Sequence, residues 1–65
     1  NQIVHITNIK GETKIIVKDA VGKKVHENTA YKSHYQLNVS KYSPGTYHIR
    51  LDTDITCEII KIIVY

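Results

Sequence analysis

The clearest alternation of apolar and polar residues lies in residues 42–51, which read YSPGTYHIRL. Tyr47, Ile49 and Leu51 fall on one side of this segment, and the polar residues between them fall on the other. A period of two is typical of an antiparallel strand with one buried face. The pattern therefore predicts a strand over residues 46–52, and the other strands are expected to cover its apolar face.

A Pro-Gly pair precedes this strand. Proline fixes φ and glycine tolerates positive φ, so Pro44 and Gly45 predict a type II turn. A large tyrosine just after such a turn is typical of antiparallel sandwiches, where the ring lies inside and its hydroxyl bonds nearby backbone. We expect Tyr47 to be such an interior anchor.

Shorter alternating segments predict further strands at residues 2–7, 13–18, 23–28, 35–39 and 55–65. The side chains expected to face the core are Ile15, Val17, Val25, Tyr35, Leu37 and Val39. Turns are predicted at residues 8–12, 19–22 and 52–54, a crossing loop at 29–34, and a single helical turn at 40–43 with Ser40 as its cap. The whole pattern predicts an all-β protein, a small antiparallel sandwich of six or seven strands.

The last segment, residues 55–65, is apolar on both faces. Ile60, Ile62 and Val64 share one face, and Lys61 lies between Ile59 and Ile63 on the other. Such strands are either covered on both sides or meet another partner. A helix is the alternative, but β-branched residues dominate and disfavour it.

Size and composition narrow the class of protein. Sixty-five residues form one domain with a modest core. Phe, Trp and Met are absent, and the apolar residues are mostly Ile and Val, which favour strands. The single cysteine, Cys57, forms no intrachain disulfide, and we expect it to be a small half-buried apolar residue.

The formal net charge is +3, with the basic residues spread along the chain. This spread argues against a dedicated nucleic-acid face. No apolar run approaches the roughly 18 residues of a membrane span. Because a strand-like run starts at once, we interpret residues 1–65 as a single domain that lacks its first few residues.

Three blocks, read in order, resemble a known family. They are KIIVKDAVGKKV at residues 14–25, LNVSKYSPGTYHIRL at 37–51 and KIIVY at 61–65. Together they resemble the type A C-terminal sorting domain of the bacterial type IX secretion system. The chain departs from that pattern at Lys18, where the family often has an aromatic residue, and at Tyr42, where it usually has leucine.

The resemblance implies an immunoglobulin-like sandwich and a non-enzymatic role. Such a domain directs an attached N-terminal cargo through the periplasm and outer membrane to the cell surface or medium, and is usually removed afterwards. Its expected partners are the secretion machinery, a sortase-like processing protease and the cargo. No cofactor, metal, nucleic acid or membrane span is implied. The residues that carry the resemblance, here called the motif residues, are Asp19, Gly22, Lys23, Pro44, Gly45, Tyr47, Lys61, Ile62 and Val64.

Other residues with chemical potential have simpler interpretations. Four histidines suggest a metal site, but no two have a chelating spacing, so each is expected to be solvated and alone. They are His5, His26, His34 and His48. Asp19, Asp52 and Asp54 are expected in turns, so no catalytic arrangement follows. Tyr31 and Tyr65 are the tyrosines expected at the surface, too few to make a convincing stacking platform.

The lysines next to the matched blocks leave two interpretations open. Lys23, Lys24 and Lys61 can simply protect sheet edges from pairing. Alternatively, Lys61 and the strand after it form the surface read by the secretion machinery, by strand addition at an open edge. The same edge could support strand-mediated self-association.

Two other functions remain as alternatives at this point. One is an immunoglobulin-like or fibronectin-like module of an extracellular enzyme that binds carbohydrate or protein. The other is a purely structural spacer.

Overall fold

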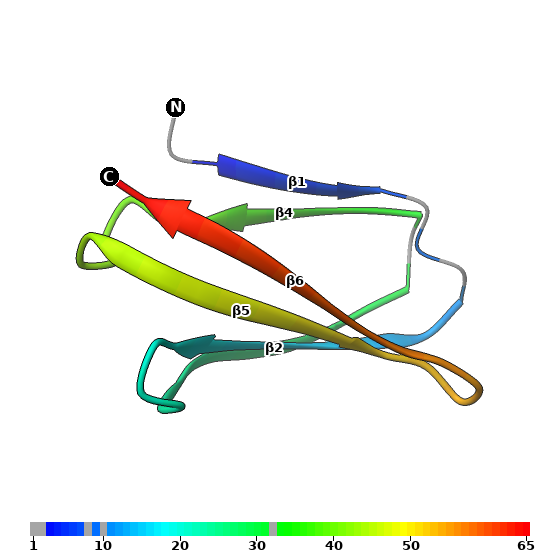
Figure 1. Ribbon diagram of the computed structural model, residues 1–65. Helices are drawn as coiled ribbons and strands as arrows, with labels where there is room; N and C mark the ends of the chain where they lie inside the picture. The colour runs from blue at the N-terminus through cyan, green and yellow to red at the C-terminus, as the bar shows by residue number, and fades with distance from the viewer. Residues whose placement is uncertain (1–2, 8, 10, 32) are drawn as a thin grey trace.

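The computed structural model describes residues 3–7, 9, 11–31 and 33–65. Its six strands form two antiparallel sheets, one with the order β1-β4 and one with the order β3-β2-β5-β6 (Figure 1). The strands are β1 (Ile3–Thr7), β2 (Thr13–Asp19), β3 (Lys24–Ala30), β4 (His34–Asn38), β5 (Gly45–Asp52) and β6 (Cys57–Val64). The prediction of an all-β antiparallel sandwich is confirmed. Within the described residues, no helix is long and apolar enough to cross a membrane.

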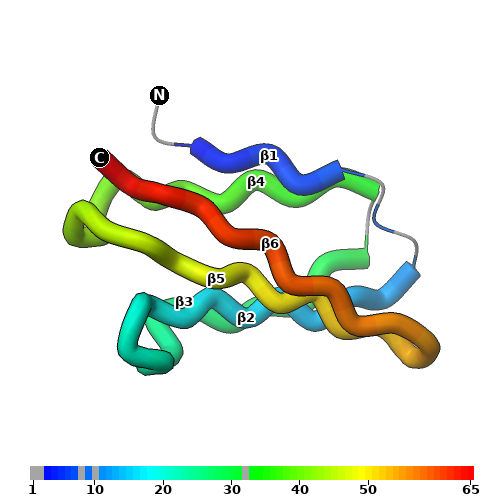
Figure 2. The backbone as a smooth tube through the Cα atoms, in the orientation of Figure 1, coloured from blue at the N-terminus to red at the C-terminus, as the bar shows by residue number. Residues whose placement is uncertain are grey.

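The core lies between the two sheets. Its most deeply buried side chains are Ile15 and Val17 of β2, Ile49 of β5 and Leu37 of β4. Figure 2 shows the short β1-β4 pair lying over one face of the larger sheet. The inward positions predicted for β2, β4 and β5 are confirmed, although Tyr35 is only half-buried. Alternation thus correctly identified the central faces of the sandwich.

The prediction that Val25 faces inward is wrong. The register of β2 and β3 shifts between Val17 and Lys18, so that Val17 pairs with His26 and Lys18 with Lys24. This bulge leaves Val25 unpaired and 39% exposed. His26 and Asn28 take the inward positions of β3 instead, opposite Val17 and Ile15.

Two predicted loops have different bounds in the structure. The expected loop at 29–34 is shorter, because β3 continues through buried Ala30 and β4 begins at His34. Residues 8 and 10 of the turn expected at 8–12 lie outside the described residues, as do residue 2 of the first predicted strand and Lys32 of this loop.

The chain reversal before β5 also differs from the prediction. The turn is closed by a hydrogen bond from Tyr42 N to Val39 O. The side chain that accepts a backbone hydrogen bond here is that of Asn38, which bonds Ser40 N, and not the expected cap Ser40. Gly45 has the expected positive φ, but at 150° it already belongs to β5 and pairs with Val64. The type II turn at Pro44 and Gly45 is therefore wrong. The pair leads into the strand instead of reversing the chain.

Two tyrosines pack together beneath this reversal. The ring of Tyr47 is 6% exposed, and its hydroxyl donates a 2.6 Å hydrogen bond to Ser43 O, so the predicted interior anchor is confirmed. The ring of Tyr42 lies 5.0 Å away between centroids. Its hydroxyl is buried and has no hydrogen-bond partner among the described residues. Burial, with smaller effects of Tyr35 and Tyr47, raises the pKa of Tyr42.

The unpartnered hydroxyl predicts that Tyr42→Phe stabilises the fold. A buried polar atom without a partner costs about 1 kcal/mol or more, and phenylalanine keeps the ring while removing that atom. Urea unfolding should therefore show a higher free energy of unfolding, by about 1 kcal/mol. Tyr47→Phe is the matched control, because it removes a hydroxyl that is bonded and should lower stability by a similar amount. Destabilisation by both changes would contradict the assignment.

Candidate functional site

The motif residues come together at one end of the four-stranded sheet. Tyr47 of β5 lies opposite Asp19 of β2 on one side and Ile62 of β6 on the other, and Gly45 lies opposite Val64. Figure 1 shows the β2-β3 turn, the start of β5 and the C-terminus at this same end. Three blocks that are distant in sequence thus form one continuous region.

The Asp-x-x-Gly-Lys part of the motif builds the β2-β3 turn. The side-chain oxygen Oδ1 of Asp19 accepts hydrogen bonds from Val21 N (3.1 Å) and Lys23 N (2.9 Å). Gly22 has φ of 92°, a conformation that other residues rarely adopt. Asp19 and Gly22 therefore shape the turn, whereas Lys23 is exposed at its surface.

The terminal strand β6 is an edge strand. Among the described strands it pairs with β5 alone, and its register places Ile60, Ile62 and Val64 toward the core face. The outer face of β6 carries Ile59 and Ile63, which are 66% and 53% exposed, with exposed Lys61 between them. The prediction of a doubly apolar strand, and not a helix, is confirmed. Its outer face has no covering layer in the described structure.

A small hollow lies beside the end of this strand. It is lined by Ile3, Val4, Val39, Ile62, Ile63, Val64 and Tyr65, which come from β1, from the segment after β4 and from the C-terminal end. Tyr65 itself is almost fully exposed. The hollow therefore lies next to the open edge of β6.

The histidines are less isolated than the sequence predicts. The Nδ1 atom of His5 lies 3.1 Å from the Nε2 atom of His34 across β1 and β4, and Nε2 of His26 lies 2.9 Å from the Tyr35 hydroxyl. Asn28 also donates to that hydroxyl at 3.2 Å. The expectation that each histidine stands alone is wrong for His5, His26 and His34, because strand pairing joins residues that are far apart in sequence. His48 is exposed, as expected. The His26–Tyr35 contact links the edge strand β3 to β4. The sequence alone does not predict it, because the bulge decides that His26 faces inward.

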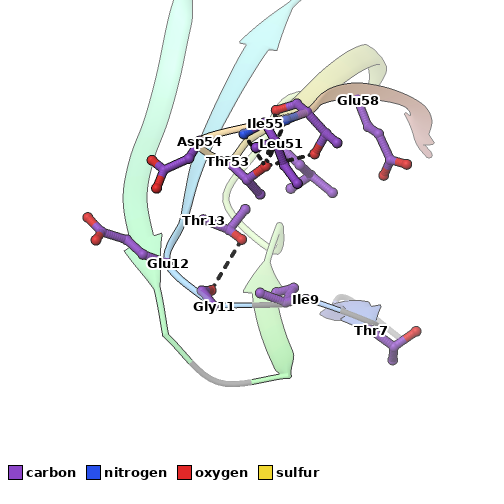
Figure 3. A pocket seen from close by; sticks show the side chains of 11 residues that line it. Thr7, Ile9, Gly11, Glu12, Thr13, Leu51, Thr53, Asp54, Ile55 and Glu58 are labelled. Atoms are coloured by element: carbon purple, nitrogen blue, oxygen red, sulfur yellow. Dashed lines mark hydrogen bonds between the residues drawn. The ribbon is translucent and has the colours of Figure 1, made fainter.

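A cleft opens at the opposite end of the sandwich (Figure 3). It lies between the β1-β2 connection and the β5-β6 hairpin, and acidic side chains of Glu12, Asp54 and Glu58 line it. Figure 3 shows Glu12 and Asp54 on one side and Glu58 on the other. Over the described residues, no group of three or more His, Cys, Asp or Glu side chains is arranged to hold a metal ion. The cleft contains none of the motif residues.

Cys57 is exposed on the outer face of β6, so the expectation of a half-buried residue is wrong. Its register partner is Asp52, whose carboxylate also lies 3.0 Å from Nε of Arg50. A hydrogen bond to the Asp52 carboxylate raises the pKa of the Cys57 thiol. The same bond, with that of Arg50, lowers the pKa of Asp52. The thiol is thus exposed, and this shift disfavours its more nucleophilic thiolate form.

This contact predicts that Asp52→Asn makes Cys57 more reactive. Without the carboxylate, the thiol pKa falls, so a larger fraction is thiolate at mildly alkaline pH. Alkylation by iodoacetamide, followed by mass spectrometry, should be faster than in the parent chain. Asp54→Asn, a change of the same kind in the adjacent loop, should leave the rate unchanged. Equal rates in all three chains would show that Asp52 does not control the thiol.

Comparison with known proteins identifies the family of this chain. The family model described as the secretion system C-terminal sorting domain matches residues 1–65, the whole chain. No curated protein and no solved structure gives a significant match. The protein therefore belongs to the family of secretion-system C-terminal sorting domains.

Proposed function

We propose that this domain directs an attached N-terminal cargo across the bacterial outer membrane by the type IX secretion system, with β6 as the segment that the machinery reads. The observation that carries the proposal is the meeting of all three motif blocks beside an edge strand. Asp19, Tyr47 and Ile62 lie opposite one another on three neighbouring strands, and the buried motif residues around them stabilise the fold. Lys61, Ile59 and Ile63 of β6 remain exposed.

Recognition takes place by strand addition at the free edge of β6. An added strand would form main-chain hydrogen bonds with β6 and contact its exposed isoleucines. After passage through the periplasm and outer membrane, a sortase-like protease separates the domain from its cargo, which reaches the cell surface or medium. The domain itself performs no chemistry in this scheme.

Export of a reporter fused in front of residue 1 tests the proposal. Deleting residues 62–65 should abolish secretion by a host that has the system, but this deletion also removes Val64, a buried core residue. Point changes at exposed positions separate recognition from folding. Ile63→Lys should lower export by about ten-fold, because it replaces an apolar contact at the strand edge with a charge that opposes strand pairing.

Ile55→Lys is the matched control. Ile55 is 90% exposed in the β5-β6 hairpin, at the end away from the motif residues. Export of this variant should equal that of the parent, and both variants should unfold at the same urea concentration as the parent. Undiminished secretion of the deletion or of Ile63→Lys would rule out β6 as the recognised segment.

A further inference from the structure

The outer face of the four-stranded sheet gathers basic residues that are scattered in sequence. The register places Lys24 opposite Lys18, Lys18 opposite His48, and His48 opposite Lys61. Opposite residues on neighbouring strands lie about 5 Å apart and share a face of the sheet. Four residues from four strands therefore form one row, here called the basic row, and all four are exposed.

Acidic residues neutralise only part of this face. Glu27 pairs with Lys24 and, at 3.1 Å, with Lys14, while Asp52 pairs with Arg50. In the parts of the chain that the structure describes, no ion pair involves Lys18 or Lys61. The carboxylates that line the cleft, from Glu12, Asp54 and Glu58, belong to the opposite end of the sandwich. Lys18 and Lys61, which lie on either side of His48 in the row, therefore carry charges that no ion pair compensates in the described part of the chain.

Apolar side chains accompany the row. On β6, Ile59 and Ile63 flank Lys61 on the same face, and both are more than half exposed. The face therefore combines ammonium groups with aliphatic side chains on an open sheet surface. This composition differs from that of most protein interfaces, where Lys is depleted and Trp, Tyr and Arg provide the anchors.

We propose that the basic row and its flanking isoleucines bind an anionic lipid surface. Ammonium groups are attracted to the phosphates of such a surface, and the isoleucines can enter the boundary between headgroups and acyl chains. The contact uses the outer face of the sheet, and strand addition uses the main-chain edge of β6; the two surfaces share Ile59 and Ile63, whereas Lys18 belongs to the lipid contact alone. It goes beyond the proposed role in export and does not depend on the secretion machinery.

Sedimentation of the 65-residue chain with vesicles tests the proposal. The chain should bind vesicles of phosphatidylcholine containing about one third phosphatidylglycerol at low salt, and should not bind vesicles of phosphatidylcholine alone. Raising the salt to about 300 mM should weaken the binding, because the Debye length shortens. Lys18→Gln and Lys61→Gln should each weaken binding by about five-fold. Glu27→Gln should strengthen it, since it removes an acid from the face.

Lys41→Gln is the matched control. Lys41 is exposed in the turn before β5, outside the sheet, and its removal lowers the net charge by the same amount. Equal weakening by Lys41→Gln would show that net charge alone is responsible and would overturn the assignment to this face. Equal affinity for the two kinds of vesicle, or no binding to either, would also overturn it. If the chain instead binds immobilised polyglutamate but not vesicles, and Lys18→Gln abolishes that binding, the ligand of this face is an acidic protein surface and not a lipid.

The two proposals fail in different measurements. The vesicle assay uses the purified chain and lacks any secretion component, whereas the reporter assay measures export in cells. If Lys18→Gln loses vesicle binding and is still exported normally, the result supports the lipid contact and leaves the proposed role in export unaffected. Defective export of Ile63→Lys without any vesicle binding by the parent would keep only the first.

Discussion

The fold depends on a sheet of two strands covering a sheet of four. The cover lies over the inner faces of β2 and β5, where Ile15, Val17 and Ile49 have no exposed surface. Burial of each such side chain stabilises the fold by about 1.5–3 kcal/mol, so these positions provide much of the core. Because the two-stranded sheet is narrower than the four-stranded one, the outer strands β3 and β6 are less fully covered by it than β2 and β5 are.

The two flanks meet this constraint differently. On β3, His26 and Asn28 replace apolar residues at inward positions and bond the Tyr35 hydroxyl of β4. A polar contact suits this place, because it tolerates the water that reaches the edge of a small sandwich. On β6, only the end is well covered, where Val64 is buried, and Ile60 remains partly exposed. The flank without a polar contact is therefore the one with apolar surface left for a partner.

Sequence alone identified the strands whose alternation is unbroken, which include β5 with Tyr47 and β2 with Ile15 and Val17. It failed at Val25, because a bulge shifts the period by one residue and leaves no local sign in the sequence. It also missed the His5-His34 contact and the basic row, since both depend on which strands are neighbours. Alternation predicts the facing of a strand, but only the sheet order shows which residues meet across it.

The position of Lys61 affects how two copies of β6 could pair edge to edge. In an antiparallel pairing of two β6 strands centred on this residue, Ile59 of one copy would lie opposite Ile63 of the other, and Ile60 opposite Ile62. That register gives the best apolar match, but it also brings the two Lys61 ammonium groups opposite each other, which is destabilising. A shift of the centre to Ile60 relieves the repulsion but places Lys61 opposite Ile59, so an apolar contact is lost. A different strand with an acidic or neutral residue opposite Lys61 avoids both the charge repulsion and the lost apolar contact. Lys61 therefore disfavours pairing between two copies of β6 relative to pairing with such a strand.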